Sequence, residues 1–184
     1  MLTSSLSCQN RRQAFTLTEA AIVLGVVGIV MAAIWGAASS VASNKNINKA
    51  VEDQAMIVQN MRSLYKSRPM KTGTANFTEL MMKAEIFPPS MIIDGKAFPQ
   101  TAWGTDVKIE PSVATRFEIT YLPPLPTEVC AQLIARAAGP NRDRGLTKID
   151  FGGGGYTTSD QLSSVTATTV PACTRASFNY NIQG

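Results

Sequence analysis

The sequence predicts an α+β protein in which a long N-terminal helix, apolar in its first half, packs on a C-terminal globular head with an antiparallel sheet. Two observations predict this arrangement. No proline interrupts residues 15–66, and residues 20–38 consist only of apolar side chains and glycine. Beyond residue 105, short stretches of alternating apolar and polar side chains are separated by proline and glycine, as expected for antiparallel strands joined by turns.

The composition argues against an enzyme. The 184 residues fit one modest domain and include no histidine, which removes the commonest general base and the usual partner of a nucleophilic serine or cysteine. We therefore predict no catalytic residue, no cofactor and no metal site. The net charge of +4 includes Arg11 and Arg12 near the N-terminus, and no cluster of basic and aromatic residues follows. We expect no direct nucleic-acid partner.

The apolar run 20–38 is long enough to cross a bilayer. The polar and basic residues 1–14 before it are typical of a targeting segment. One interpretation is an ordinary secretory signal, cut at one of the alanine pairs near the end of the run. Glu19 argues against it, because a carboxylate entering a bilayer is costly and usually marks a paired position. If the chain is cut between Ala14 and Phe15, the α-amine of a neighbouring copy can pair with Glu19.

Residues 11–19 carry a motif with fixed spacing: Arg11-Arg12-Gln13-Ala14, then Phe15-Thr16-Leu17-Thr18-Glu19, then the apolar helix. This motif resembles the class III signal of type IV pilins and pseudopilins. The resemblance implies that a membrane prepilin peptidase cuts between Ala14 and Phe15 on the cytoplasmic side, N-methylates Phe15 and leaves the helix attached. It also implies that Glu19 is the carboxylate used in assembly. The family usually has glycine before the cut, so Ala14 predicts slower processing.

The helix is expected to continue beyond the length that a membrane requires. On the pilin resemblance, residues 1–14 are a leader peptide and residues 15–40 a transmembrane and filament-core helix. Residues 41–68 keep apolar side chains at helical spacing, which predicts an amphipathic helix with one face on the head. The helix is predicted to stop near Pro69, and residues 69–184 form the head.

The first part of the head is predicted to hold a short helix and a hairpin. Asn76 is predicted to cap the helix, with Glu79 three residues later in the position of a capping box. Residues 105–110 and 115–122 are predicted to be strands, with a turn around Pro111-Ser112 between them.

The second part of the head is predicted to add a helix and two strands. Thr127 is predicted to cap a helix over residues 128–138. Residues 146–151 are predicted to be a strand, and the Ser/Thr-rich stretch 157–169 a surface loop. Residues 173–182, with alternating aromatic and asparagine side chains, are predicted to be the final strand.

Two cysteines remain once a leader containing Cys8 is removed. Cys130 and Cys173 are predicted to form a disulfide, which on a loop-entropy argument stabilises the fold by about 4 kcal/mol. Two free thiols or a metal site are the alternatives, although two cysteines without histidine leave a zinc shell half empty. A disulfide favours an oxidising compartment and places the head outside the cytoplasm. On the pilin resemblance, this bond closes a surface region, the D-region, over residues 130–173.

Together these features predict the major structural subunit of a type IV pilus. The wide cysteine spacing and the segments Ala102-Trp103-Gly104, Phe117-Glu118-Ile119-Thr120-Tyr121 and Val129-Cys130 are similar to type IVb subunits of bundle-forming and conjugative thin pili. The resemblance implies a homo-oligomeric helical filament that serves adhesion, bundling or conjugative contact.

The expected partners are the prepilin peptidase, the pilus assembly platform and further copies of the chain. The subunit is expected in the bacterial inner membrane before assembly and in an extracellular pilus afterwards. Within the family, a minor pilin or a type II secretion pseudopilin is the alternative. Outside it, the alternative is a signal-anchored periplasmic binding protein or enzyme, for which Glu19 would have no role.

Overall fold

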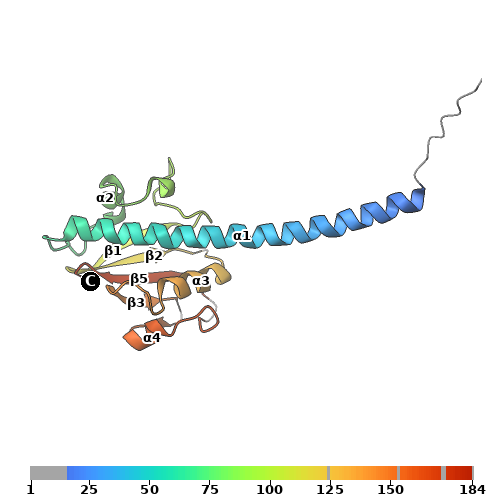
Figure 1. Ribbon diagram of the computed structural model, residues 1–184. Helices are drawn as coiled ribbons and strands as arrows, with labels where there is room; N and C mark the ends of the chain where they lie inside the picture. Colours follow the sequence, from blue (N-terminus) through green and yellow to red (C-terminus); the bar gives the residue numbers. More distant parts are fainter. Residues whose placement is uncertain (1–15, 124, 153, 171–172, 184) are drawn as a thin grey trace, which may run out of the picture. The chain divides into compact units, whose positions relative to one another are not determined.

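A computed structural model describes residues 16–123, 125–152, 154–170 and 173–183, without the side chains of residues 39 and 40. The chain divides into two units, Met1–Ala42 and Ser43–Gly184, and each is described by itself. The elements in order are helix α1 (Leu17–Tyr65), α2 (Phe77–Lys83), the 3₁₀ turn η1 (Pro89–Met91), strands β1 (Val107–Val113) and β2 (Arg116–Tyr121), α3 (Thr127–Ala137), β3 (Leu146–Asp150), β4 (Gly155–Tyr156), α4 (Ser159–Ser163) and β5 (Ala176–Asn181) (Figure 1).

The second unit, the head, is built on a five-stranded antiparallel sheet with the order β1-β2-β5-β3-β4. Its residues alternate between a buried and a polar face. Across four neighbouring strands, one row on the buried face consists of Ile109, Ile119, Phe178 and Ile149, all 0% exposed. The alternation that predicted β2 and β5 therefore also fixes the register, because a slip of one residue would expose this row.

The later part of α1, from Ser43 to Tyr65, covers the buried face of the sheet (Figure 1). Ile47, Ile57 and Met61 are 0% exposed, at the helical spacing expected of one apolar face. Gln54 lies on the same face and is 2% exposed. Its amide donates to the Tyr180 hydroxyl at 2.7 Å and accepts from the Tyr121 hydroxyl at 3.1 Å, so this buried polar group is satisfied.

Helices α2 and α3 flank α1 on the head. The Thr78 hydroxyl of α2 donates to the Ile109 carbonyl and accepts from its N–H, which occupies an outward-facing pair of groups on edge strand β1. On the other side, the Arg136 guanidinium of α3 donates to the side-chain oxygens of Asn44, at 3.0 Å, and Asn48. The segment that follows α2 reaches the long helix, because the Asn60 side-chain amide donates to the Ile86 carbonyl at 2.9 Å, so α1 is held on the α2 side as well as on the α3 side.

The structure confirms the predicted fold class and several of the predicted elements. The long helix, the strand near residues 146–150 and the last strand lie where the apolar spacing placed them. Cys130 and Cys173 form the predicted disulfide.

The predicted position of the hairpin turn was wrong. Strand β1 continues through Pro111 to Val113, and the chain turns at Ala114 and Thr115. Pro111 is tolerated because β1 is an edge strand, and the pairing shifts between Pro111 and Val113 as in a β-bulge.

Both predicted helix caps were also wrong in detail. Asn76 occupies the N-cap position of α2, as predicted, but it has a left-handed backbone (φ 59°) and forms no side-chain capping bond, and Glu79 pairs with Lys83 at 2.7 Å instead of completing a capping box. Thr127 is the first residue of α3, and Pro126 occupies the cap position. The helix therefore begins one residue earlier than predicted, and no side chain caps it.

The stretch 157–169, which was predicted to be a surface loop, is partly helical. It contains α4, which starts with a capping box: Thr158 accepts from the Gln161 N–H, and the Gln161 side chain accepts from the Thr158 N–H. Leu162, Val165 and Val170 are buried beneath it. Their wide spacing among serine and threonine obscured this small core in the sequence.

Candidate functional site

The first unit presents an apolar surface that none of its described residues, from Thr16 to Ala42, covers. In α1 as far as Ala42, the large apolar side chains are between 45% (Val27) and 90% (Leu17) exposed. They are Leu17, Ile22, Val23, Leu24, Val26, Val27, Ile29, Val30, Met31, Ile34, Trp35 and Val41. The helix is long and apolar enough to cross a membrane, by length and composition. Such a surface requires lipid or other protein around it.

Small residues lie at four-residue spacing on this helix. Ala21 and Gly25 form one pair, and Gly28 and Ala32 the other. A Cβ atom added at Gly25 or Gly28 would meet nothing within 4 Å. Glycine inside a helix costs about 1 kcal/mol relative to alanine, so the helix alone gives no reason for these glycines. Close approach of another helix does, because small-xxx-small pairs let two backbones meet.

Glu19 lies exposed in the first turn of α1. Thr16 starts the helix: its carbonyl accepts from the N–H groups of Glu19 and Ala20, and its hydroxyl accepts from the Glu19 N–H at 3.4 Å. Among the residues that the structure describes, the Glu19 carboxylate forms no ion pair. Ala14 and Phe15, the predicted cleavage and methylation sites, lie outside the described residues.

The disulfide joins α3 to the segment that leads into β5. The Cα atoms of Cys130 and Cys173 are 5.9 Å apart, and the two residues are 0% and 2% exposed. The bond therefore lies in the core and closes the region 130–173 at its base.

An ion pair joins Arg62, near the end of α1, to Asp143, which lies between the two disulfide-bonded cysteines. Arg62 donates from two nitrogens to the two carboxylate oxygens of Asp143, at 2.8 and 2.6 Å, and from Nε to the Asn181 carbonyl. Asp143 also accepts from the Gly145 N–H at 2.7 Å. The hydrogen bond from Arg62 lowers the pKa of Asp143 below its usual value. No motif marks this pair in the sequence, since its members are 81 residues apart.

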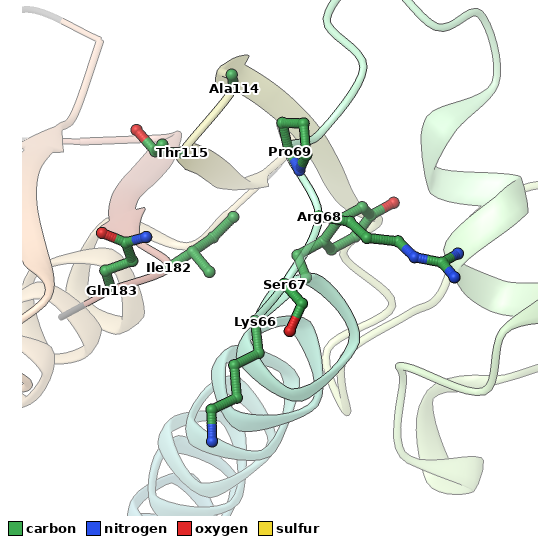
Figure 2. Close-up of a pocket in the computed structure, with 9 residues that line it drawn as sticks. Lys66, Ser67, Arg68, Pro69, Ala114, Thr115, Ile182 and Gln183 are labelled. Atoms are coloured by element: carbon green, nitrogen blue, oxygen red, sulfur yellow. The ribbon is translucent and has the colours of Figure 1, made fainter.

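A shallow pocket of about 290 Å³ lies where the end of α1, the β1–β2 turn and the end of the chain meet (Figure 2). Ile182 and Pro69 supply apolar surface, and Thr115 and Ser67 supply hydroxyls. The side chains of Lys66 and Arg68 point in different directions in Figure 2. Across the described ranges, no group of three or more Cys, Asp or Glu side chains could hold a metal ion.

Comparison with protein families agrees with this geometry. A family described as PilS N terminal matches residues 44–182, which are 139 of the 184 residues and include the whole sheet, and a Prokaryotic N-terminal methylation motif matches residues 9–35. The chain belongs to the PilS family of type IV pilins. The methylation motif ends at Trp35 in the apolar helix, and the PilS match begins at Asn44, next to the start of the head of this pilin at Ser43. No curated protein and no solved structure gives a significant match.

Pilins are structural proteins, so these matches point to a structural role for this chain. The pilin carries the prepilin signal, an apolar N-terminal helix suited to membrane anchoring and a disulfide-bonded α+β head. The methylation motif implies processing by a prepilin peptidase and entry into pilus assembly.

Proposed function

We propose that this pilin is the major structural subunit of a type IV pilus. The observation that carries the proposal is the exposed apolar surface of α1 between Leu17 and Val41, set beside a head that buries its own core. Copies of the chain would cover this surface by packing their helices together in the interior of a filament. The small-xxx-small pairs then allow neighbouring helices to approach closely.

In this proposal, each range of the chain has its own role in processing and assembly. Residues 1–14 are a leader that the prepilin peptidase removes by cutting between Ala14 and Phe15, after which the amine of Phe15 is methylated. Residues 15–40 anchor the subunit in the membrane and then form the filament core. Residues 41–68 continue the helix on the head, and residues 69–184 complete the head, with its D-region over 130–173.

Glu19 receives a specific role in this proposal. Its carboxylate has no ion-pair partner among the described residues, and a charge that enters an apolar environment requires one. The α-amine of Phe15 on a neighbouring subunit is the proposed partner. An unpaired carboxylate would cost several kcal/mol in the filament core, so the pair selects the register in which subunits stack.

The proposed location follows from the two ends of the molecule. The apolar helix would hold the subunit in the bacterial inner membrane, and the disulfide supports a head on the oxidising side of that membrane. An assembly platform in that membrane would then extract subunits into an extracellular pilus. By its resemblance to type IVb subunits, we assign the pilus to adhesion, bundling or conjugative contact.

N-terminal mass analysis of the protein isolated from its host tests the processing step. The expected product begins with methylated Phe15. A chain that begins at Met1, or one that begins beyond residue 32, would contradict the proposal. An Ala14→Gly variant should be processed faster, because glycine is the residue that the family usually carries before the cut.

Electron microscopy of cells carrying Glu19→Ala tests the assembly step. The variant should insert in the membrane and be processed, but form no filaments. Glu52→Ala is the matched control, because it makes the same change at an exposed position of α1 on the head. An anchored binding protein would keep its function in both variants, and a minor pilin would form filaments only when another pilin is present.

A further inference from the structure

The apolar helix changes character at one aromatic residue, Trp35. Its side chain is 78% exposed, and it is the only tryptophan, tyrosine or phenylalanine between residues 16 and 64. Before it, residues 20–34 are all apolar or glycine, and most are large. After it, residues 36–46 contain a single large apolar side chain, Val41, together with serine, asparagine and lysine. The boundary between the two compositions therefore lies at the indole.

The length of the helix on the N-terminal side of Trp35 fits one bilayer core. From Leu17 to Trp35 the helix advances 18 residues, or about 27 Å at about 1.5 Å per residue. The hydrocarbon core of a bilayer is about 30 Å thick. Glu19, the last charged residue before the run, lies close to one limit, and Trp35 lies at the other.

Tryptophan is the side chain best suited to that second limit. Its ring is apolar, while its N–H donates a hydrogen bond, so it settles at the level of the lipid headgroups. An aromatic residue meant only for helix packing would not need to coincide with the end of the apolar run.

We propose that Trp35 is the interfacial anchor that sets how deep the subunit lies in the membrane before assembly. Its ring lies at the outer headgroup level of the lipid bilayer, residues 17–34 span the hydrocarbon, and residues 36–42 lie on the aqueous side. This inference rests on the membrane-anchored stage of the proposed function. It shortens the membrane-embedded segment, since residues 36–40 then belong to the filament core only after extraction.

Fluorescence quenching by lipids measures the depth directly. The full chain carrying Trp103→Phe, so that Trp35 is its single tryptophan, is placed in phosphatidylglycerol–phosphatidylcholine vesicles with spin-labelled lipids. The label is placed either near the headgroup or deep in the acyl chain. A matched chain carries Ile29→Trp, Trp35→Phe and Trp103→Phe. If Trp103→Phe prevents folding of the head, Trp103→Tyr with excitation selective for tryptophan replaces it.

The expected result is opposite behaviour of the two tryptophans. Trp35 should be quenched more strongly by the shallow label, and Ile29→Trp by the deep label. If both are quenched best by the deep label, the chain is inserted and the role of Trp35 is wrong. If neither is quenched by either label, the chain does not enter the bilayer, and the membrane stage of the proposed function fails as well.

Thiol labelling separates an anchor from a residue that merely occupies the boundary. In a Cys8→Ser background, Ala38→Cys should react with a membrane-impermeant thiol reagent in vesicles, whereas Ile34→Cys should be protected. Adding Trp35→Leu should lower the reactivity of Ala38→Cys severalfold, because the apolar run then slides deeper. Adding Trp35→Tyr should restore it, since tyrosine also settles at the interface. Equal reactivity in the Leu and Tyr variants would overturn the anchor role.

Discussion

The two parts of helix α1 place similar residues in opposite environments. From Leu17 to Ala42 the large apolar side chains are exposed, whereas from Ser43 to Tyr65 one face, with Ile47, Ile57 and Met61, is fully buried on the sheet. The backbone is helical throughout. The helical sequence alone therefore does not determine burial. The head covers one part of the helix, and the other part leaves an exposed apolar surface that lipid or another protein would cover.

The largest effect is expected from removing the disulfide, which acts on the head alone. Replacing both Cys130 and Cys173 by serine should lower the free energy of unfolding of the head by about 4 kcal/mol, because the loop between them is then free in the unfolded chain. Chemical denaturation of the full chain in detergent measures this, with the helical signal of the apolar part as an internal control. An unchanged denaturation midpoint would show that the core of the head does not depend on this closure.

Matched isoleucine substitutions compare the two parts of α1 directly. Ile57→Ala should lower the free energy of unfolding of the head by about 2–5 kcal/mol, because Ile57 is 0% exposed and leaves a cavity. Ile29→Ala, at a residue 74% exposed, should leave that free energy unchanged and instead reduce the yield of filaments. Thermal unfolding and filament pelleting measure the two effects, and an equal loss of head stability in both variants would break the comparison.

A pair of glycine substitutions tests the same comparison between the head and the apolar part of α1. A Cβ at Gly145 would collide with the Arg62 guanidinium and lie 3.0 Å from the Asn181 carbonyl, so Gly145→Ala should disrupt the Arg62–Asp143 pair and cost about 1–2 kcal/mol. Gly25→Ala meets nothing within 4 Å and should leave the head unchanged while weakening filaments. Denaturant midpoints of the two variants measure the contrast, and Gly145→Ala with wild-type stability would contradict the role of the pair.

The smallest effects are expected in acid, where two aspartates of the head act in opposite directions. Arg62 lowers the pKa of Asp143, so its stabilising contribution is present above pH 3.8 and is lost as the pH falls through the folded-state pKa. Burial raises the pKa of Asp53, so its contribution is present below pH 3.8 and is lost as the pH rises through the folded-state pKa. Solvent screening keeps the effect at Asp143 below about 1 kcal/mol.

Substitution by asparagine separates these two effects. Asp143→Asn should flatten the loss of head stability between neutral pH and pH 3, whereas Asp53→Asn should stabilise the head near neutral pH. Thermal melts across this range measure both. The same sign of change at neutral pH in the two variants would contradict the assigned environments.

Features with a regular period were predictable from the sequence. The apolar run, the amphipathic continuation and the alternation in β2 and β5 each repeat a pattern that only one kind of element can bury. The processing motif was recognisable because its residues are contiguous. The disulfide could be predicted by counting cysteines, because only two remain beyond the leader.

Features that depend on contacts between distant segments were not predictable. Arg62 and Asp143 meet only because α1 ends beside the loop before β3. Gln54 looks like a surface residue, yet two tyrosines from β2 and β5 satisfy its amide in the core. The capping hydrogen bonds predicted for Asn76 and Thr127 are absent. A side chain that can cap a helix shows only that capping is possible, and the backbone around it decides whether the bond forms.

A helical reconstruction of filaments by electron microscopy tests the central claim most directly, because it shows what covers the apolar part of α1. The account predicts that the side chains from Ile22 to Trp35 lie in the filament interior against helices of neighbouring subunits, with the heads outside. Filaments joined through the heads alone, with these side chains facing away from other subunits, would contradict it.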